Sequence, residues 1–117
     1  KSPYMSATAT KVEQAARFGL NERELATLRS ILGTIPEIKL VYVYGSRAKG
    51  NYKAGSDINL AIMEPATDLR LRSKIQSLFD DSHLAMRVDL VDFQSLESDS
   101  LKAHIARVGL PIYKAVS

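Results

Sequence analysis

The sequence predicts a small α/β (α+β) domain in which a β-sheet carries helices on at least one face. Three short segments predict strands: residues 38–44 are rich in β-branched and aromatic residues, residues 57–63 alternate between apolar and polar residues, and residues 87–93 form a third short strand. Apolar residues in the stretches around these strands recur at the spacing of an α-helix. Strands that alternate with amphipathic helices are typical of a layered fold.

Two helices are expected before the first strand. The first is a short helix over residues 8–18. The second begins at Asn21, because Glu24 three residues later completes the pattern of a capping box, and it ends between Gly33 and Pro36. Its apolar residues share one helical face: Leu25, Leu28, Ile31 and Leu32.

Two further helices are expected after the second and third strands. One begins at Thr67 or Asp68, and the other begins at Ser98 or Asp99 and ends at Gly109. We expect their inward faces to hold Leu71, Ile75, Leu78 and Phe79 in the first, and Leu101, Ile105 and Val108 in the second.

The chain has the length of one domain, with 117 residues. We expect residues 21–117 to form that domain and residues 1–20 to be an extension or short helix, with a flexible start at 1–6. Residues 110–115 predict a final strand at the edge of the sheet, because Pro111 lacks the N–H that a central strand would donate.

Composition excludes several kinds of site. The absence of cysteine excludes disulfides and thiolate metal sites, and two histidines, His83 and His104, give little basis for zinc. The sequence shows no apolar run of membrane-spanning length and no signal peptide, so a cytoplasmic location is expected. The net charge of +3 is spread along the chain, which favours a solvated surface over a nucleic-acid patch.

The second predicted strand presents polar residues on one face. Side chains alternate between the two faces of a strand, so Ile58, Leu60 and Ile62 face the core. Asp57 and Asn59 point the other way and lie about 7 Å apart. Two oxygen-bearing side chains at this spacing can converge on a hard cation.

The third strand repeats this pattern, because Asp89 lies opposite in parity to Val88 and Leu90. If the two strands are neighbours, Asp89 joins Asp57 and Asn59 in a cluster of oxygen ligands suited to Mg²⁺. The alternative is that these residues form a solvated polar face of the sheet. The carboxylates alone favour neither the metal site nor the solvated face. Asp92 shares the parity of the core side and is expected to be a loop or cap residue.

The loop before the second strand favours the metal reading. Gly45 and Ser46 follow directly on a strand, and glycine there lets a phosphate approach the backbone. The Ser46 hydroxyl can donate a hydrogen bond, and Arg47 and Lys49 can neutralise a polyphosphate. The same turn without the acidic strand ten residues later would be weak evidence.

These residues resemble the signature of the polymerase-β-like nucleotidyltransferase superfamily. That signature is Gly-Ser, ten residues, then Asp-x-Asp, and here Gly45-Ser46 precedes Asp57-Ile58-Asn59. The segment GSRAKGNYKAGSDINLAI is similar to sequences of the minimal nucleotidyltransferase (MNT) branch. The segments RVDLV and HIARVGLPIY also resemble that branch. The similarity spans about residues 21–115.

The resemblance implies a nucleotidyltransferase fold, with a mixed β-sheet flanked by helices. It implies that ATP or another nucleoside triphosphate binds at Gly45 and Ser46, and that Asp57, residue 59 and Asp89 hold Mg²⁺. The family has aspartate where this chain has Asn59. Asparagine gives up a unit of charge and cannot bridge two ions, so nucleotide binding should survive better than turnover.

The resemblance also implies a partner. The chain is too short to hold an acceptor domain, and MNT proteins typically act on a helical HEPN protein, as the antitoxin of a toxin–antitoxin pair that adenylylates the HEPN ribonuclease. The alternative is a nucleotide-binding antitoxin that acts by contact without catalysis. A nucleic-acid-binding module rests on the basic charge alone and is the weakest reading.

Three aromatic or imidazole side chains near these motifs are expected to be structural. Tyr44 is expected to pack within its strand, where it could also border the nucleotide. Tyr52 is expected to cover the phosphate-side loop rather than stack on a base. His104 is expected to be a helix residue without a metal.

Overall fold

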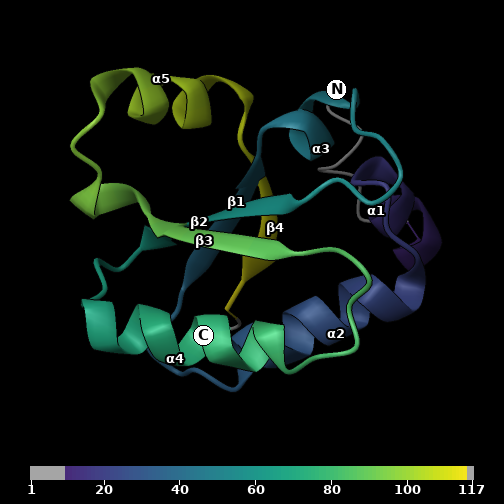
Figure 1. Ribbon diagram of the computed structural model, residues 1–117, viewed down its shortest axis with the longest axis horizontal. Coiled ribbons are helices and arrows are strands. Elements are labelled where there is room, and N and C mark those ends of the chain that lie inside the picture. Colours follow the sequence, from purple (N-terminus) through teal and green to yellow (C-terminus); the bar gives the residue numbers. More distant parts are fainter. Residues whose placement is uncertain (1–9, 116–117) are drawn as a thin grey trace.

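A four-stranded mixed sheet forms the centre of the protein in this computed structural model, which describes residues 10–115 (Figure 1). The spatial order of the strands is β3-β2-β1-β4, with β1 antiparallel to both of its neighbours and β2 parallel to β3. The expected mixed sheet and the edge position of the last strand are confirmed. The strands are β1 (Leu40–Tyr44), β2 (Ile58–Glu64), β3 (Val88–Asp92) and β4 (Leu110–Lys114).

Helices cover both faces of the sheet. In Figure 1, α2 and α4 lie below the sheet, and the short α3 and the longer α5 lie above it. A 3-10 helix, η2 (Phe93–Ser95), joins β3 to α5. The α-helices are α1 (Lys11–Arg17), α2 (Glu22–Gly33), α3 (Ser46–Lys49), α4 (Leu69–Asp80) and α5 (Asp99–Val108).

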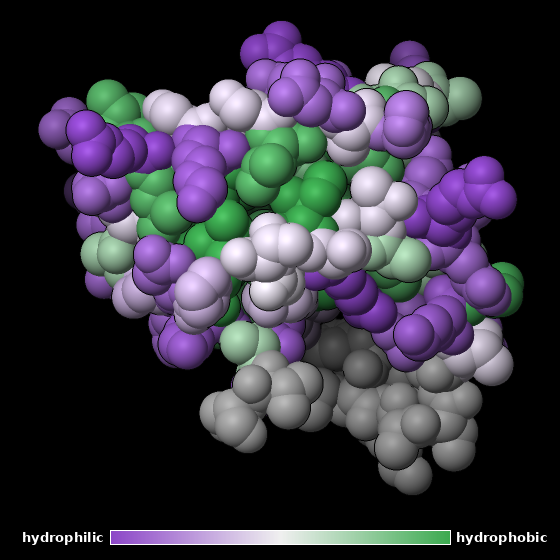
Figure 2. Space-filling view, turned by 90° about the horizontal axis from the view of Figure 1, so that it is seen from below, coloured by the Kyte–Doolittle hydropathy of each residue, from purple (hydrophilic) through white to green (hydrophobic). Residues whose placement is uncertain are grey.

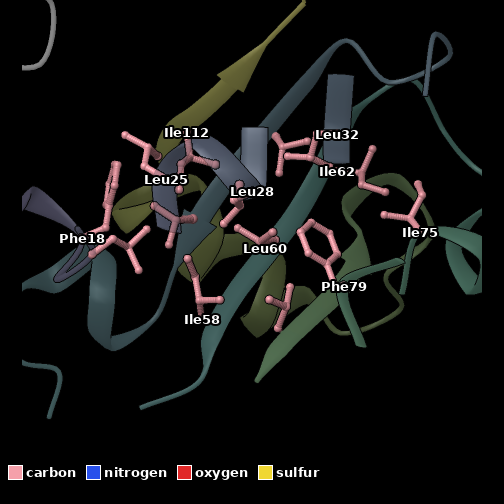
Figure 3. Packing of buried hydrophobic residues seen from close by; sticks show 14 of the residues in the cluster. Phe18, Leu25, Leu28, Leu32, Ile58, Leu60, Ile62, Ile75, Phe79 and Ile112 are labelled. Atoms are coloured by element: carbon pink, nitrogen blue, oxygen red, sulfur yellow. The ribbon is translucent and has the colours of Figure 1, made fainter. Parts of the chain in front are cut away.

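The main core lies between the sheet and the layer of α1, α2 and α4 (Figure 3). The strands contribute alternate residues to it, as the sequence predicts: Val41 and Val43 from β1, Ile58, Leu60 and Ile62 from β2, and Val88 from β3. A second, smaller cluster lies on the opposite face under α5 and contains Tyr44, Ala61 and Ile105. One face of β2 therefore lies in the main core, and the other carries Asn59 beside the buried Ala61.

Side-chain caps define where the helices begin. Asn21 accepts a hydrogen bond from the N–H of Glu24 (2.7 Å), and Glu24 accepts one from the N–H of Asn21 (2.9 Å), which confirms the expected capping box. Of the paired alternatives, Asp68 caps α4 and Ser98 caps α5. The cap at Asn21 fixes the chain between α1 and α2, and the caps at Asp68 and Ser98 fix it after β2 and β3.

The elements differ from the sequence predictions in a few places. The first strand begins at Leu40 rather than at residue 38, and Asp57 lies just before β2 rather than within it. The expected first helix included residues 8 and 9, which lie outside the described residues, as do residues 1–6 and 116–117.

The outer surface of the helical layer is partly apolar. Leu78 was expected to face inward but is 37% exposed, whereas Ile75 and Phe79 on the same helix are buried. Leu69, at the start of α4, is 71% exposed. Figure 2 shows the molecule from below, where hydrophobic residues gather at the centre of the face within a hydrophilic surround.

Candidate functional site

Polar residues from β2 and β3 form a row on the side of the sheet that faces α5. Asn59 on β2 is the register partner of Asp89 on the parallel strand β3, and neighbouring strands lie about 4.8 Å apart. On its other side, Asn59 pairs with Tyr44 at the end of β1. The adjacency on which the sequence reading depended is confirmed: β2 and β3 are neighbours in the sheet.

Asp57 lies two residues before Asn59, at the entrance to β2. The strand alternation that buries Ile58 leaves Asp57 exposed, and Asp89 is exposed as well. The backbone N–H of Ile58 donates to the carbonyl of Arg87 (2.9 Å), which ties the starts of the two strands together. The two carboxylates therefore stand at neighbouring strand starts and are open to solvent.

The turn at Gly45 joins the end of β1 to α3. Gly45 has φ of 78° and ψ of −149°, a backbone conformation that side chains disfavour. A Cβ at this position would also lie 2.7 Å from Nδ2 of Asn59. The main chain of the expected phosphate turn thus packs directly on Asn59, and Ser46 follows as the first residue of α3.

Of the two expected phosphate-neutralising side chains, only Lys49 is accessible. Lys49 ends α3 and is exposed. Arg47 is 3% exposed, and its guanidinium donates hydrogen bonds to the carbonyls of Phe18, Gly19 and Ser56. The expected phosphate contact of Arg47 does not fit this placement, because its N–H groups are directed at main-chain oxygens in the interior.

Tyr44 lies beside the row of polar residues, as the register partner of Asn59. It is 7% exposed, and its ring meets the His104 ring of α5 edge-on, with centroids 6.2 Å apart. Burial raises the pKa of the Tyr44 phenol, and the negative charge of Asp89 raises it further. The sequence reading expected Tyr44 to pack within its strand but missed His104 as its neighbour, because only the fold brings α5 over β1.

The oxygen atoms of the row are suited to a metal site in which the protein supplies some of the ligands and a substrate supplies the others. Asp57 and Asp89 offer carboxylates, and Asn59 offers one amide oxygen. Within residues 10–115, no three His, Cys, Asp or Glu side chains come together as a possible metal site. Mg²⁺ is often held by one or two carboxylates together with substrate phosphates, and these residues fit that mode of binding.

Comparison with known families assigns the segment of the chain that contains the candidate site. Residues 26–116, which include the turn and all three polar residues, match the family model for polymerase beta, nucleotidyltransferase. The chain belongs to this nucleotidyltransferase family. It is also similar to a probable protein adenylyltransferase MntA from Haemophilus influenzae, with 35% identity over 85 residues, or 72% of this chain and 75% of the relative.

Solved structures of other family members superpose on this nucleotidyltransferase. A chain of a toxin–antitoxin crystal structure with AMP-PNP matches with a TM-score of 0.60 and 30% identity, over 82% of this chain and 75% of that chain. A complex of a tri-AMPylated Shewanella oneidensis HEPN toxin with an MNT antitoxin matches with a TM-score of 0.58 and 25% identity, over 80% and 72%. The expected nucleotidyltransferase fold is confirmed.

Two residues near the site have structural positions. Tyr52 places its ring 5.2 Å from the Arg47 guanidinium carbon and covers the loop, in the manner expected. Asp92 ends β3 with 1% exposure, and its carboxylate accepts hydrogen bonds from the N–H of Thr67 (3.3 Å) and the hydroxyl of Ser95. Asp92 therefore ties two segments together on the core side and is not a ligand at the row.

The longest α-helices, α2 and α4, have 12 residues each. Across residues 10–115, no helix has the length and apolar character needed to cross a membrane.

Proposed function

We propose that this nucleotidyltransferase binds a nucleoside triphosphate with Mg²⁺ and transfers the nucleoside monophosphate, AMP from ATP, to a partner protein. The partner we propose is a helical HEPN toxin, for which this chain is the antitoxin. One observation carries the proposal: Asn59 lies in register with Asp89 and against Gly45, so the phosphate turn and the acidic strand starts meet.

The residues at this junction supply the parts that nucleotidyl transfer needs. Asp57 and Asp89 would hold Mg²⁺, with Asn59 as a weaker neutral oxygen ligand. When bound, Mg²⁺ neutralises charge that develops on the transferring phosphate and the leaving pyrophosphate. Ser46 is placed to donate a hydrogen bond to the polyphosphate, and exposed Lys49 can approach it.

Asp89 has a second role in this proposal. Its carboxylate is exposed at a strand start, where an acceptor hydroxyl from a partner can reach it. There it can accept the proton that the hydroxyl loses as its oxygen attacks the α-phosphorus. The α-phosphorus then forms a bond to that oxygen, and its bond to the pyrophosphate oxygen breaks.

Asn59 should slow this reaction more than it weakens nucleotide binding. The amide is neutral, so the site holds two carboxylates where the family pattern has three. The loss of this negative charge matters most where a cation must be held beside the reacting phosphate in the transition state. Each 1.4 kcal/mol of transition-state stabilisation lost there slows the step about tenfold.

The choice of partner and nucleotide draws on the relatives. The similar H. influenzae protein is described as a probable protein adenylyltransferase. One matching structure contains AMP-PNP, and another contains a HEPN toxin that carries AMP groups beside its MNT antitoxin. These relatives support ATP as the donor and a HEPN protein as the acceptor for this chain.

The decisive experiment measures binding and transfer separately. Isothermal titration with ATP, in Mg²⁺ and in EDTA, is applied to the wild type and to Asn59→Asp. Each form is also co-expressed with the protein of the adjacent reading frame, which we propose to be the HEPN partner, and the intact mass of that protein is measured. We expect Mg²⁺-dependent ATP binding in both forms and more AMP addition with Asn59→Asp.

An exposed carboxylate outside the site gives the control. Asp81 directly follows α4, and Asp81→Asn should leave ATP binding and AMP addition unchanged. Asp89→Asn should abolish AMP addition. If neither the wild type nor Asn59→Asp binds ATP, the proposed function is wrong.

A second candidate function follows from Asn59 itself. A site with two carboxylates and an amide could bind nucleotide without turning it over, and the chain would then restrain its partner by contact alone. The same experiment separates the two functions. ATP binding with no AMP adduct on the partner, even with Asn59→Asp, would favour the contact-only antitoxin.

A further inference from the structure

Arg47 connects the phosphate turn to the loop that delivers Asp57. It directly follows Ser46, and its Nη2 and Nε both donate to the carbonyl of Ser56, at 2.8 and 3.2 Å. Ser56 in turn directly precedes Asp57. Arg47 therefore connects the main chain on both sides of the site. Its backbone is part of α3, and its guanidinium is hydrogen-bonded to the main chain at the entrance to β2.

The other edge of the guanidinium is held by the end of the N-terminal helix. Nη1 donates to the carbonyls of Phe18 (2.9 Å) and Gly19 (3.2 Å). The Tyr52 ring packs over the guanidinium, and Gly19 makes room for both. A Cβ on Gly19 would lie 2.4 Å from Cε1 of Tyr52 and 2.8 Å from Nη1 of Arg47.

This arrangement requires arginine in particular. A charge that is 97% buried needs good hydrogen bonds, and the planar fork supplies them to carbonyls from two separate segments. A lysine ammonium is a single point and cannot reach both sets of carbonyls at these distances.

The loop between α3 and β2 has few other anchors at its far end. At its start, the N–H groups of Gly50 and Asn51 donate to the carbonyl of Ser46 (2.9 and 3.1 Å). At its end, the N–H of Lys53 donates to Oγ of Ser56 (2.9 Å), which closes the loop on itself but not on the rest of the protein. The two bonds from Arg47 provide that attachment just before Asp57.

We propose that Arg47 is a positioning residue that holds the Asp57 carboxylate beside the Ser46 turn without itself contacting the nucleotide. This inference rests on the proposed function, in which Asp57 is a ligand of Mg²⁺. Residues that orient a metal ligand typically change metal affinity or activity about 10–100-fold when they are replaced. The expected signature is a loss confined to the metal-dependent part of ATP binding.

The test compares Arg47→Lys with a matched control, Arg29→Lys. Arg29 is also partly buried and also donates to a carbonyl, that of Ile112 (2.9 Å), but it lies between α2 and β4, away from the site. ATP affinity is measured by titration in Mg²⁺ and in EDTA, and amide hydrogen exchange is measured over residues 53–58 in the absence of nucleotide.

Arg47→Lys should weaken ATP binding about 10–100-fold in Mg²⁺ and leave the affinity in EDTA unchanged. It should also speed hydrogen exchange over residues 53–58, and Arg29→Lys should do neither. Equal losses in Mg²⁺ and EDTA would overturn the proposal, because they would indicate a direct phosphate contact. Unchanged exchange over residues 53–58 would also overturn it.

The exchange measurement separates this inference from the proposed function. A wild type that binds no ATP refutes the proposed function, while faster exchange in Arg47→Lys alone would still establish the attachment of the loop. If Arg47→Lys does not fold, Tyr52→Leu serves as the second variant, because it removes the ring over the guanidinium. It should show a smaller change of the same kind, and no change would overturn the proposal.

Discussion

Gly45 lies so close to Asn59 that a Cβ added to the glycine would stand 2.7 Å from Nδ2 of the amide. The contact joins the turn after β1 to the polar face of β2. It adds a second reason for glycine at a position whose φ of 78° already disfavours side chains. The identity of residue 45 therefore controls both the turn and the placement of residue 59.

Gly45→Ala should weaken ATP binding as well as folding. The backbone at Gly45 (φ 78°, ψ −149°) lies in a region that is essentially restricted to glycine, and an alanine held there should lose about 1–3 kcal/mol of unfolding free energy. The new methyl group must also displace the Asn59 amide from its place beside the turn. Urea denaturation measures the first effect, and titration with ATP in Mg²⁺ measures the second.

Gly50→Ala is the control for this prediction. Gly50 has a similar φ of 85°, but a Cβ there would meet nothing within 4 Å. Because its ψ of 6° places Gly50 in the left-handed helical region, which alanine tolerates better, Gly50→Ala should lose less stability than Gly45→Ala and keep its ATP affinity. Equal ATP affinities in the two variants would show that the contact with Asn59 is unimportant.

The polar row was predictable because strand alternation is a short-range rule. Parity placed Asp57 and Asn59 on the face of their strand opposite its apolar residues, and did the same for Asp89 on the next strand, while the adjacency of the two strands came from the structure. The turn was predictable from a glycine directly after a strand, which admits backbone conformations that other residues disfavour, taken together with the acidic strand ten residues later.

The direction of Arg47 could not be read from its neighbours. Successive residues of a helix are rotated by about 100°, so Arg47 turns away from Ser46 toward the interior, while Lys49 returns to within about 60° of the Ser46 direction. Two of the three carbonyls that Arg47 binds belong to Phe18 and Gly19, far away in sequence. Only the packing of α1 against this region creates them as partners.

The burial of Asp92 was hidden for the same reason. Parity placed it on the core side, but its partners Thr67 and Ser95 come from the segments before α4 and within η2. A charged residue at a strand end is usually solvated, and the sequence gives no sign of donors arriving from two other places.

Asp92→Ala should destabilise the fold. The carboxylate is 1% exposed, and its removal leaves the N–H of Thr67 and the hydroxyl of Ser95 without their acceptor. Loss of a buried acceptor of this kind costs about 1–3 kcal/mol. Urea denaturation measures the change, and exposed Asp81→Ala should stay within about 0.5 kcal/mol of the wild type. Equal stability in the two variants would contradict the buried tie.

Tyr44 should make stability fall at high pH. Burial, and then the charge of Asp89, raise the pKa of its phenol above the usual value, because both favour the neutral form. The contribution is fully present below the unfolded pKa of about 10 and is lost as the pH rises through the folded pKa.

The unfolding free energy of the wild type and of Tyr44→Phe, measured across this range, tests that contribution. The difference between them should change above about pH 10, with the wild type losing more stability as the pH rises. Asp89→Asn should lower the pKa of Tyr44, which NMR titration of the ring can follow. A difference that is constant with pH would contradict the raised pKa.

Asn59→Asp should make the stability of the chain depend on Mg²⁺. The change adds a third carboxylate to the row, next to the register partner Asp89 and two residues from Asp57. In EDTA their repulsion should lower the unfolding free energy by about 1 kcal/mol, because Asp57 and Asp89 are exposed and solvent screens their charges. Mg²⁺ binds the folded row and not the unfolded chain, so it should reverse this loss and raise the melting temperature as its concentration increases. Asn51→Asp makes the same change of net charge at an exposed loop residue that is not part of the row, and should respond weakly in both conditions. Thermal denaturation of the two variants at matched ionic strength separates the local effect from general screening, and an equal response to Mg²⁺ would mean that the three positions do not converge on a cation.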